Sequence, residues 1–220
     1  MIGKGKSISH GVAALEYDLA KEINGQAVAT EIARHELYGC TGAEMVQEMK
    51  PYHIDFPNVK NNCLRFEVSP AIEESATFTD ADWAELGNDF MQRMGLANHQ
   101  YIIIRHSGTE SKKEQAHLHI LANRVSLSGE RYRDNWIGKK ATEAANAIAK
   151  ERNFVQSQDI GKVNKAEIKE AMDGVLKKMQ GFDFTKFKEE LGKRGFKVRE
   201  ARASTGKLNG YYVTARSGTE

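Results

Sequence analysis

Apolar residues recur along the chain at two spacings, and the wider one predicts four helices within the first 155 residues. Between Gly11 and Glu22, the residues Val12, Leu15 and Leu19 fall at helical spacing after a short N-terminal strand. Later segments combine the same spacing with capping residues or a high alanine content. The predicted helices cover residues 11–22, 41–51, 79–95 and 138–152.

Three other segments alternate apolar and polar residues and are predicted to be strands. Residues 62–69 place Leu64 and Phe66 on one face of a half-buried strand. Residues 100–106 and 116–126 flank the polar stretch SGTESKKEQ, which is typical of an extended hairpin loop, so we expect them to pair antiparallel. Hairpin strands mixed with helices favour an α/β (α+β) fold with a largely antiparallel central sheet and flanking helices.

The last third of the chain has a separate organisation. A polar connector is expected over residues 155–162, followed by helices at 164–180 and 183–194. The segments FKVREA and LNGYYVTA then flank a Ser-Thr-Gly-Lys turn, which predicts a two-stranded ribbon. We therefore expect a core domain over residues 1–155 and a small, basic helical and β-ribbon subdomain over residues 163–220.

Composition places the chain among ordinary globular proteins, with 40% hydrophobic and 28% charged residues. No apolar run reaches membrane-spanning length, and the N-terminus lacks the continuous apolar stretch of a signal peptide. A cytoplasmic protein without a membrane segment is expected. The two cysteines, Cys40 and Cys63, are too widely spaced to suggest a disulfide framework or a thiolate metal cluster.

Charge is unevenly distributed along the chain. Residues 1–100 carry 8 Lys and Arg against 15 Asp and Glu, whereas residues 101–220 carry 24 against 15, a net charge of +9. Such an excess is expected where one side of a molecule meets phosphates, because basic side chains there release condensed counterions. A solvated helical surface explains the same excess equally well.

Three histidines form a candidate metal site. On an alternating strand His117 and His119 share one face, while Leu118 and Ile120 point into the opposite, apolar layer. His106 ends the preceding strand and reaches the same point if the two strands form a hairpin. Three neutral imidazoles would bind a divalent cation and leave open positions for substrate oxygens. An H-x-H pair alone also arises by chance among seven histidines, as partly buried or surface residues.

The order of histidines along the chain narrows the choice of the third ligand. No histidine follows His119, so a third imidazole has to come from an upstream segment. Only His106 lies nearby on an adjoining strand. The remaining histidines are expected in loops or helices as bystanders: His10, His35, His53 and His99.

The histidine block also carries a family resemblance. The segment YIIIRHSGTESKKEQAHLHILANRV, residues 101–125, resembles the three-histidine motif of the HUH relaxases, the mobilisation nucleases of conjugative and mobilisable elements. HGVAALEYDLAKE resembles the segment that carries their N-terminal tyrosine. RFEVSP and the helix after it resemble their central strand and helix, and the tail resembles the basic segment that follows their nuclease core. The acidic residue usual after the first histidine is replaced here by Ser107-Gly108, which leaves open which carboxylate supports the metal ligands.

The resemblance implies a site- and strand-specific DNA-nicking endonuclease that starts conjugative mobilisation. Tyr17 would attack the phosphorus and leave a 5′-phosphotyrosyl link and a free 3′-hydroxyl. His106, His117 and His119 would hold one divalent ion, Mg²⁺ or Mn²⁺ first and Zn²⁺, Co²⁺ or Ni²⁺ as alternatives. The implied partners are origin-of-transfer DNA, as single strand and supercoiled plasmid, and other relaxosome proteins.

Two candidate residues keep a structural alternative. A tyrosine hydroxyl normally holds its proton at neutral pH, so Tyr17 needs the metal or a nearby base. Glu67, on the same strand face as Arg65, is the candidate for orienting a histidine ligand or accepting that proton. Alternatively, Glu67 is a surface carboxylate paired with Arg65, and Tyr17 is a core-edge residue with a solvated hydroxyl.

Basic and aromatic residues alternate in RYRDNW, residues 131–136, which is typical of a surface that stacks single-stranded bases while pairing with phosphates. A packed Trp136 beside ordinary surface arginines is the alternative. The expected DNA-binding residues are Arg105, Lys112, Lys113, Arg124, Arg131, Tyr132, Arg133, Trp136, Lys139 and Lys140. The tail residues Lys193, Arg194, Lys197, Arg199 and Arg202 would add backbone affinity.

Two other functions remain open on the sequence. A rolling-circle replication initiator or transposase shares the histidine pair but places its tyrosine after it, which would make Tyr132 the nucleophile. A non-enzymatic DNA-binding accessory protein would use its histidines structurally. The presence or absence of a bound metal separates the second possibility from a nuclease.

Overall fold

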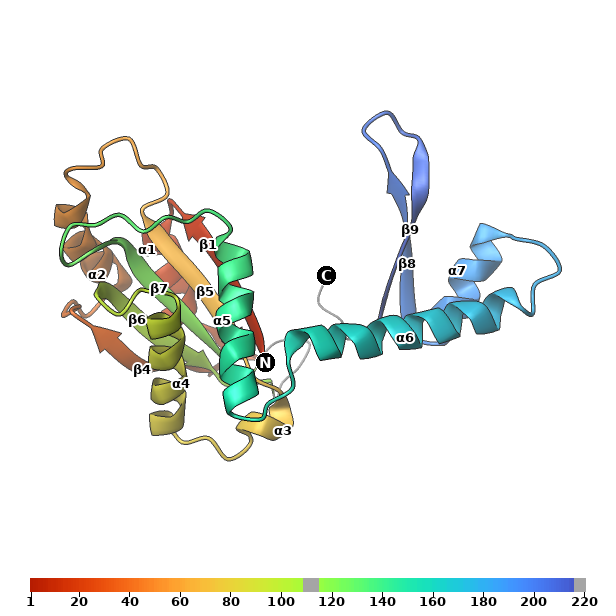
Figure 1. The fold of residues 1–220 in the computed structure, drawn as a ribbon, viewed down its shortest axis with the longest axis horizontal. Coiled ribbons are helices and arrows are strands. Elements are labelled where there is room, and N and C mark those ends of the chain that lie inside the picture. Colours follow the sequence, from red (N-terminus) through yellow and green to blue (C-terminus); the bar gives the residue numbers. More distant parts are fainter. Residues whose placement is uncertain (109–114, 216–220) are drawn as a thin grey trace. The chain divides into compact units, whose positions relative to one another are not determined.

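A computed structural model describes residues 1–108 and 115–215 and divides the chain into two compact units, residues 1–157 and 158–220. Figure 1 shows the elements of both. The boundary lies between the ends expected from the sequence for the core and the tail, residues 155 and 163. Among the described residues, no helix has the length and apolar character needed to cross a bilayer.

The first unit is built on a five-stranded sheet in which every neighbouring pair of strands is antiparallel. This confirms the expected fold class. In spatial order the strands are β1 (Ile2–Ile8), β5 (Cys63–Ser69), β7 (His117–Ser126), β6 (His99–His106) and β4 (Ala29–His35). A short hairpin, β2 (Glu22–Ile23) and β3 (Gln26–Ala27), precedes β4.

The edge strand β4 was not predicted from the sequence. Its side chains are half-buried or exposed, with no fully buried residue and no regular alternation. An edge strand packs on only one neighbour, so its apolar periodicity is weak and a pattern search misses it.

Helices cover both faces of the sheet (Figure 1). One face carries α1 (Gly11–Leu19) and α2 (Gly42–Met49), which continues into the 3₁₀ turn η1 (Lys50–His53). The other carries α4 (Asp80–Arg93) and α5 (Ile137–Glu151), and the short α3 (Ile72–Ser75) precedes α4.

Strand alternation sends successive side chains into two different cores. Phe66, Ile103 and Leu118 pack with Trp83 of α4 on one side. The residues that alternate with these along the strands point the other way, and among them Ile104 and Leu121 pack with α1 and α2 on the second face. The face under α1 and α2 is the one toward which His106, His117 and His119 point.

Two helices begin at the capping boxes expected from the sequence. Thr41 accepts from the backbone of Glu44, and Thr79 accepts from that of Asp82, with each acidic side chain binding back to the cap residue. Each cap stabilises its helix by about 1 kcal/mol. After α4, Gly95 adopts a φ of 72°, a left-handed conformation that suits glycine and ends the helix.

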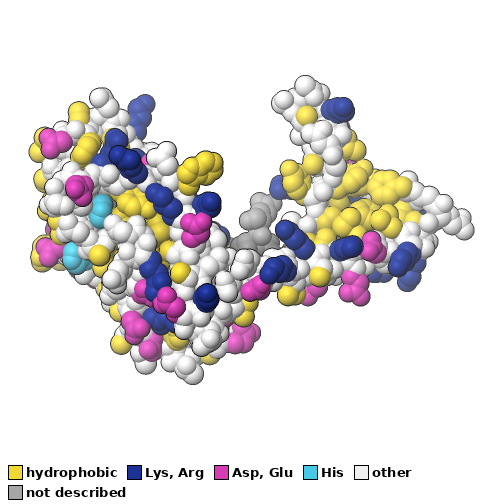
Figure 2. Space-filling model, in the orientation of Figure 1, with side chains coloured by type: hydrophobic (Ala, Val, Ile, Leu, Met, Phe, Trp, Pro, Cys, Tyr) yellow, Lys and Arg dark blue, Asp and Glu magenta, His cyan; other side chains and the backbone are white. Residues whose placement is uncertain are grey.

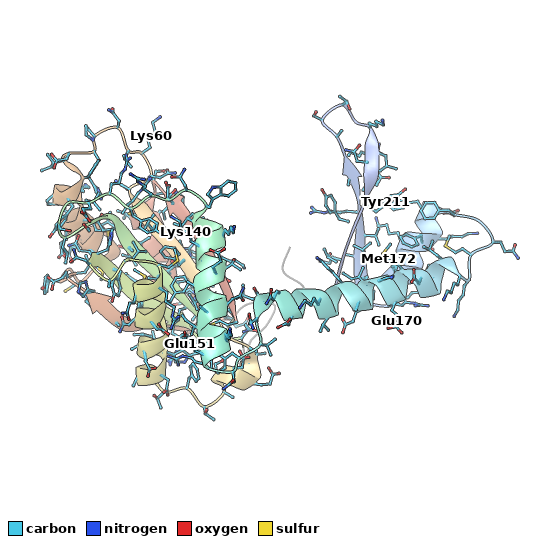
Figure 3. All side chains as sticks on the ribbon, viewed as in Figure 1. Lys60, Lys140, Glu151, Glu170, Met172 and Tyr211 are labelled. Atoms are coloured by element: carbon cyan, nitrogen blue, oxygen red, sulfur yellow. The ribbon has the colours of Figure 1, made fainter. Side chains whose placement is uncertain are left out.

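The second unit contains α6 (Ser157–Leu176), α7 (Phe184–Lys193) and a ribbon of β8 (Phe196–Arg202) and β9 (Leu208–Ala215). Phe187, Leu191 and Val198 form its small core, with Met172 and Tyr211 packed against it (Figure 3). Hydrophobic side chains gather beside the ribbon on the face shown in Figure 2.

The polar connector predicted over residues 155–162 was wrong, because α6 already begins at Ser157. The Ser157 amide and hydroxyl both donate to Asn146 Oδ1, and Asp159 lies in the first turn, where a negative charge is favourable. Polar residues at this point therefore start a helix instead of interrupting one.

Candidate active site

Pairing of β6 with β7 brings three histidines together at one end of the hairpin. His106 lies directly opposite His117, and His119 follows two residues later on the same face. One nitrogen from each ring lies within 4.8 Å of those of the other two. Three such atoms share a point no more than about 2.8 Å from each (4.8 Å divided by √3), close to the metal–imidazole distance of about 2.1 Å.

Hydrogen bonds to backbone oxygens orient two of the rings. His106 Nε2 donates to the backbone oxygen of Asp18 at 2.7 Å, which leaves Nδ1 as the lone-pair nitrogen. His117 Nδ1 donates to Gln115 O at 3.1 Å, so its Nε2 carries the lone pair, and this atom lies 3.0 Å from His119 Nε2. Backbone and carboxylate partners commonly orient metal-ligating histidines in this way.

Asp18 is a buried carboxylate beside the third histidine, whose Nδ1 is contacted by Arg65 Nη2 at 3.3 Å. Its side chain is almost fully buried, forms an ion pair with Arg65 and places Oδ1 3.7 Å from His119 Nδ1. The sequence left this carboxylate unidentified. It is detectable in retrospect, because Asp18 follows Leu15 by three residues on the apolar side of α1, where an unpaired acid is unfavourable.

Burial favours the neutral forms of His106 and His119, and metal ligands have to be neutral imidazoles. The pKa of His119 is lowered to about 2, chiefly by burial and then by the neighbouring His106 and His117. Burial also lowers the pKa of His106, with the charges of His117 and Lys21 acting in the same direction. The pKa of Asp18 is raised by burial, against the opposing effect of Arg65.

The metal-free protein is expected to lose stability as the pH falls from about 7.5 to about 5.5. Burial lowers the pKa of His99 as well as those of His106 and His119, so the unfolded chain binds protons first, below about pH 6.5. As the pH falls through that window, each imidazole that stays neutral in the fold reduces the free energy of unfolding by up to roughly 1.4 kcal/mol per pH unit. Asp18, whose pKa is raised by burial, contributes to the pH dependence in the opposite sense.

Urea unfolding in the presence of a chelator measures this slope. The His99→Gln variant, which leaves the triad intact, should show a shallower slope than the parent. A free energy of unfolding that stays constant between these two pH values would contradict neutral buried imidazoles.

Tyr17 lies one residue before Asp18, so the contacts of Asp18 with His106 and Arg65 hold this part of α1 at the triad. Its side chain is 57% exposed, in contrast to the buried Leu15 and Asp18 on the other side of the helix. The Tyr17 hydroxyl accepts a hydrogen bond from Lys21 Nζ at 2.7 Å. The Tyr17 hydroxyl is therefore solvated, which both interpretations expect, and its role as the nucleophile stays a prediction.

Glu67 lies opposite His119 in the pairing of β5 with β7 and opposite Lys4 in the pairing with β1. Its carboxylate contacts Lys4 Nζ at 3.2 Å. The alternative pairing of Glu67 with Arg65 is wrong, because Arg65 pairs with Asp18. A cavity of about 190 Å³ beside His119 is lined by Lys4, Gly5, Lys6, Arg65, Phe66 and Glu67.

Tyr132 lies at the far end of β7 from the triad. Its amide donates to Arg124 O, five residues beyond His119, which corresponds to roughly 16 Å along a strand. The ring packs against the core under α4 and α5, and Lys140 Nζ lies 4.9 Å from its centroid. Burial raises the pKa of Tyr132, which makes its hydroxyl a poorer nucleophile.

The aromatic and basic side chains of the 131–136 segment differ in how far they are exposed to solvent. Trp136 is 80% exposed and adopts a positive φ of 59°, unusual for a bulky residue. Arg131 lies over the ring of Phe56 at 5.5 Å, so it is partly engaged. Lys140, near the N-terminal end of α5 (Figure 3), donates to Arg133 O. A packed Trp136 is thus wrong for this chain.

Two arginines expected to bind DNA are not brought to the histidine face. Strand alternation points Arg105 and Arg124 to the opposite side from His106 and His119. Arg105 pairs with Asp80, and Arg124 binds Asp134 at 2.5 Å. Lys112 and Lys113 lie outside the described residues.

The other histidines form no second metal cluster within residues 1–108 and 115–215. His35 and His99 belong to strands β4 and β6, not to loops or helices as expected. His99 Nδ1 donates to Asn123 O, and His53 Nε2 lies 2.6 Å from Asn123 Oδ1. These contacts are structural.

The structure thus combines a three-histidine cluster on an antiparallel sheet with an exposed tyrosine next to Asp18, whose backbone oxygen accepts from His106. The family model of the relaxase nuclease domain, MobA/VirD2-like, matches residues 17–154. The chain belongs to this relaxase family, whose members are DNA-nicking enzymes.

Solved structures similar to the chain include the conjugative relaxase TrwC in complex with oriT DNA, in a metal-bound and a metal-free form. The metal-bound form has 11% sequence identity and a TM-score of 0.41, and the metal-free form has 10% and 0.42. Each comparison covers 94% of this chain and 74% of the other. No curated protein matches the sequence significantly.

Proposed function

We propose that the chain nicks one strand of origin-of-transfer DNA, with Tyr17 as the nucleophile and His106, His117 and His119 as ligands of one divalent ion. The hydrogen bond from His106 to the backbone of Asp18 carries this proposal, because it links the helix of the tyrosine to the triad. Family membership supplies the reaction class.

In the proposed reaction Tyr17 Oη forms a bond to the scissile phosphorus, and the bond from phosphorus to O3′ breaks. The products are a 5′-phosphotyrosyl link and a 3′-hydroxyl, which takes up a proton. Glu67, opposite His119 in the sheet, is the proposed acceptor of the Tyr17 proton. Asp18, not Glu67, would orient His119. A bound divalent ion would polarise the phosphate and stabilise its developing charge.

The donor set fits such an ion, because one nitrogen of each of the three imidazoles lies within 4.8 Å of the other two, and backbone oxygens hold the rings of His106 and His117. We propose Mg²⁺ or Mn²⁺ as the physiological ion, with Zn²⁺, Co²⁺ and Ni²⁺ able to occupy the same ligands.

The DNA strand is proposed to contact the exposed 131–140 segment. Trp136 would stack on an unpaired base, and Arg131, Arg133, Lys139 and Lys140 would pair with phosphates. Lys112, Lys113 and the basic tail are proposed to add backbone affinity. Arg105 and Arg124 would act indirectly, through the ion pairs that hold Asp80 and Asp134.

Binding to a single-stranded oligonucleotide is expected to weaken steeply with salt. If about five phosphates are contacted, the affinity should fall by roughly two orders of magnitude between about 50 and 200 mM salt. Fluorescence anisotropy measures this change, and the Trp136→Ala variant should reduce affinity while leaving the salt slope unaltered. An affinity independent of salt would exclude a phosphate-tracking surface.

Incubation with a supercoiled plasmid that carries the cognate origin tests the proposed function. The expected product is a relaxed plasmid nicked at one position of one strand, with protein on the 5′ end. We propose that the reaction takes place in the cytoplasm and that other relaxosome proteins assist it. A plasmid that stays supercoiled with added Mg²⁺ or Mn²⁺ would favour a non-enzymatic accessory protein.

A further inference from the structure

We propose that Lys21 is a catalytic residue of the nicking reaction, in which its ammonium stabilises negative charge on the oxygen of Tyr17. This inference rests on the proposed function, because it requires Tyr17 to be the nucleophile. The family comparison and the histidine motif give Lys21 no role.

The contact that carries the proposal is direct. Lys21 Nζ donates to Tyr17 Oη at 2.7 Å, and the same nitrogen lies 4.9 Å from the centroid of the Tyr17 ring. Hydrogen bonds to charged groups at this distance are about twice as strong as neutral ones. Lys21 therefore touches the atom that would react.

The backbone around Lys21 holds this contact in place. Lys21 follows α1 (Gly11–Leu19) by two residues, and its carbonyl oxygen accepts from Val28 N at 3.0 Å. That bond closes the β2–β3 hairpin, which leads into the edge strand β4. The base of the lysine side chain is thus fixed between the helix of the nucleophile and the sheet.

The chemistry of the ammonium fits stabilisation of charge and not proton abstraction. A protonated lysine has three donors and no acceptor site, so it cannot take the phenolic proton. During nicking, the bond from Oη to phosphorus forms as the bond from phosphorus to O3′ breaks, and the phenolic proton passes to a separate base. Lys21 keeps its proton throughout.

The same contact acts in the reverse direction. When a 3′-hydroxyl attacks the phosphotyrosyl link, the bond from Oη to phosphorus breaks and the Tyr17 oxygen leaves with negative charge. Lys21 would stabilise that leaving group, so its removal should slow nicking and rejoining in parallel.

The test compares Lys21→Met with Lys21→Arg and with Lys50→Met, a control that removes one positive charge from the same unit. Lys50 contacts Gln47, away from the tyrosine. Single-turnover rates of adduct formation are measured at saturating oligonucleotide, and dissociation constants are measured separately. We expect Lys21→Met to lower the rate constant by about ten- to a hundredfold and to change the dissociation constant no more than Lys50→Met does. Lys21→Arg should recover most of the rate.

An unchanged rate constant for Lys21→Met would overturn the proposal. A loss of activity explained by weaker DNA binding alone would overturn it as well, and so would a fall in the rate constant that Lys21→Arg does not restore. Thermal melting of each variant shows whether the fold is retained, and the arginine variant keeps the test informative if Lys21→Met is unstable. The Tyr17→Phe variant separates the two levels of inference. If it still forms the adduct, the nucleophile assignment fails and Lys21 fails with it. If it forms none while Lys21→Met reacts normally, only the lysine proposal fails.

Discussion

Replacing Tyr17 with phenylalanine is expected to abolish strand nicking and the covalent adduct, with a fall in rate of at least about three orders of magnitude. The variant keeps the ring and removes only the hydroxyl, which projects to solvent and contacts Lys21. Folding and DNA affinity should therefore survive within about twofold. Adduct formation on an oligonucleotide that spans the nick site, resolved by denaturing electrophoresis, measures the loss.

Tyr132→Phe is the matched control, because it makes the same chemical change on the same unit. Its hydroxyl belongs to a half-buried ring about five strand residues beyond His119, so the adduct should form at close to the parental rate. If Tyr17→Phe forms the adduct and Tyr132→Phe does not, Tyr132 is the nucleophile, as expected of a replication initiator and not of a relaxase.

Loss of the metal site is expected to have the second largest effect. His119→Ala removes one of the three proposed ligands, and a chelator should produce the same result in the parental protein. Metal stabilisation of phosphoryl charge contributes several kcal/mol, so nicking should fall by about two to three orders of magnitude or more. Binding of Mn²⁺, followed by calorimetry, should weaken at least tenfold.

The control for the triad is His10→Gln, since His10 is exposed and lies outside the cluster. It should bind Mn²⁺ and nick DNA like the parent. Full activity of His119→Ala in the presence of a chelator would exclude a histidine-bound metal from the reaction.

The histidine cluster was predictable from the sequence because its geometry is local. A hairpin of two strands with alternating faces is sufficient to bring His106 opposite His117, with His119 beside them. The central antiparallel sheet and the capped helices followed from the same short-range patterns. Assigning Tyr17 needed the family resemblance, since a tyrosine on an amphipathic helix has no distinguishing spacing.

The support of the site was not predictable because it depends on contacts between distant segments. Asp18 reaches Arg65 and His119 only once α1 packs on the sheet. The four-residue spacing of Tyr17 and Lys21 is typical of side chains that meet along a helix, but the contacts of Asp18 leave no such pattern in the sequence.

The sequence alone already indicated that two of the expected DNA-binding arginines lie away from the histidine face. Arg105 precedes His106, and Arg124 lies five residues after His119, so strand alternation already directs both arginines to the opposite face. Their basic character suggested DNA contacts, but the face that a strand residue occupies depends on whether it lies an odd or an even number of residues from the histidines. Both residues form ion pairs with aspartates there.

Peptide mapping of the covalent adduct tests the central claim most directly. After the protein reacts with an oligonucleotide and is digested with trypsin, mass spectrometry identifies the peptide that carries the 5′-phosphate. We predict the peptide of residues 7–21, SISHGVAALEYDLAK, in which Tyr17 is the only tyrosine. A nucleotide on residues 132–133, or no covalent peptide after verified nicking, would contradict the account.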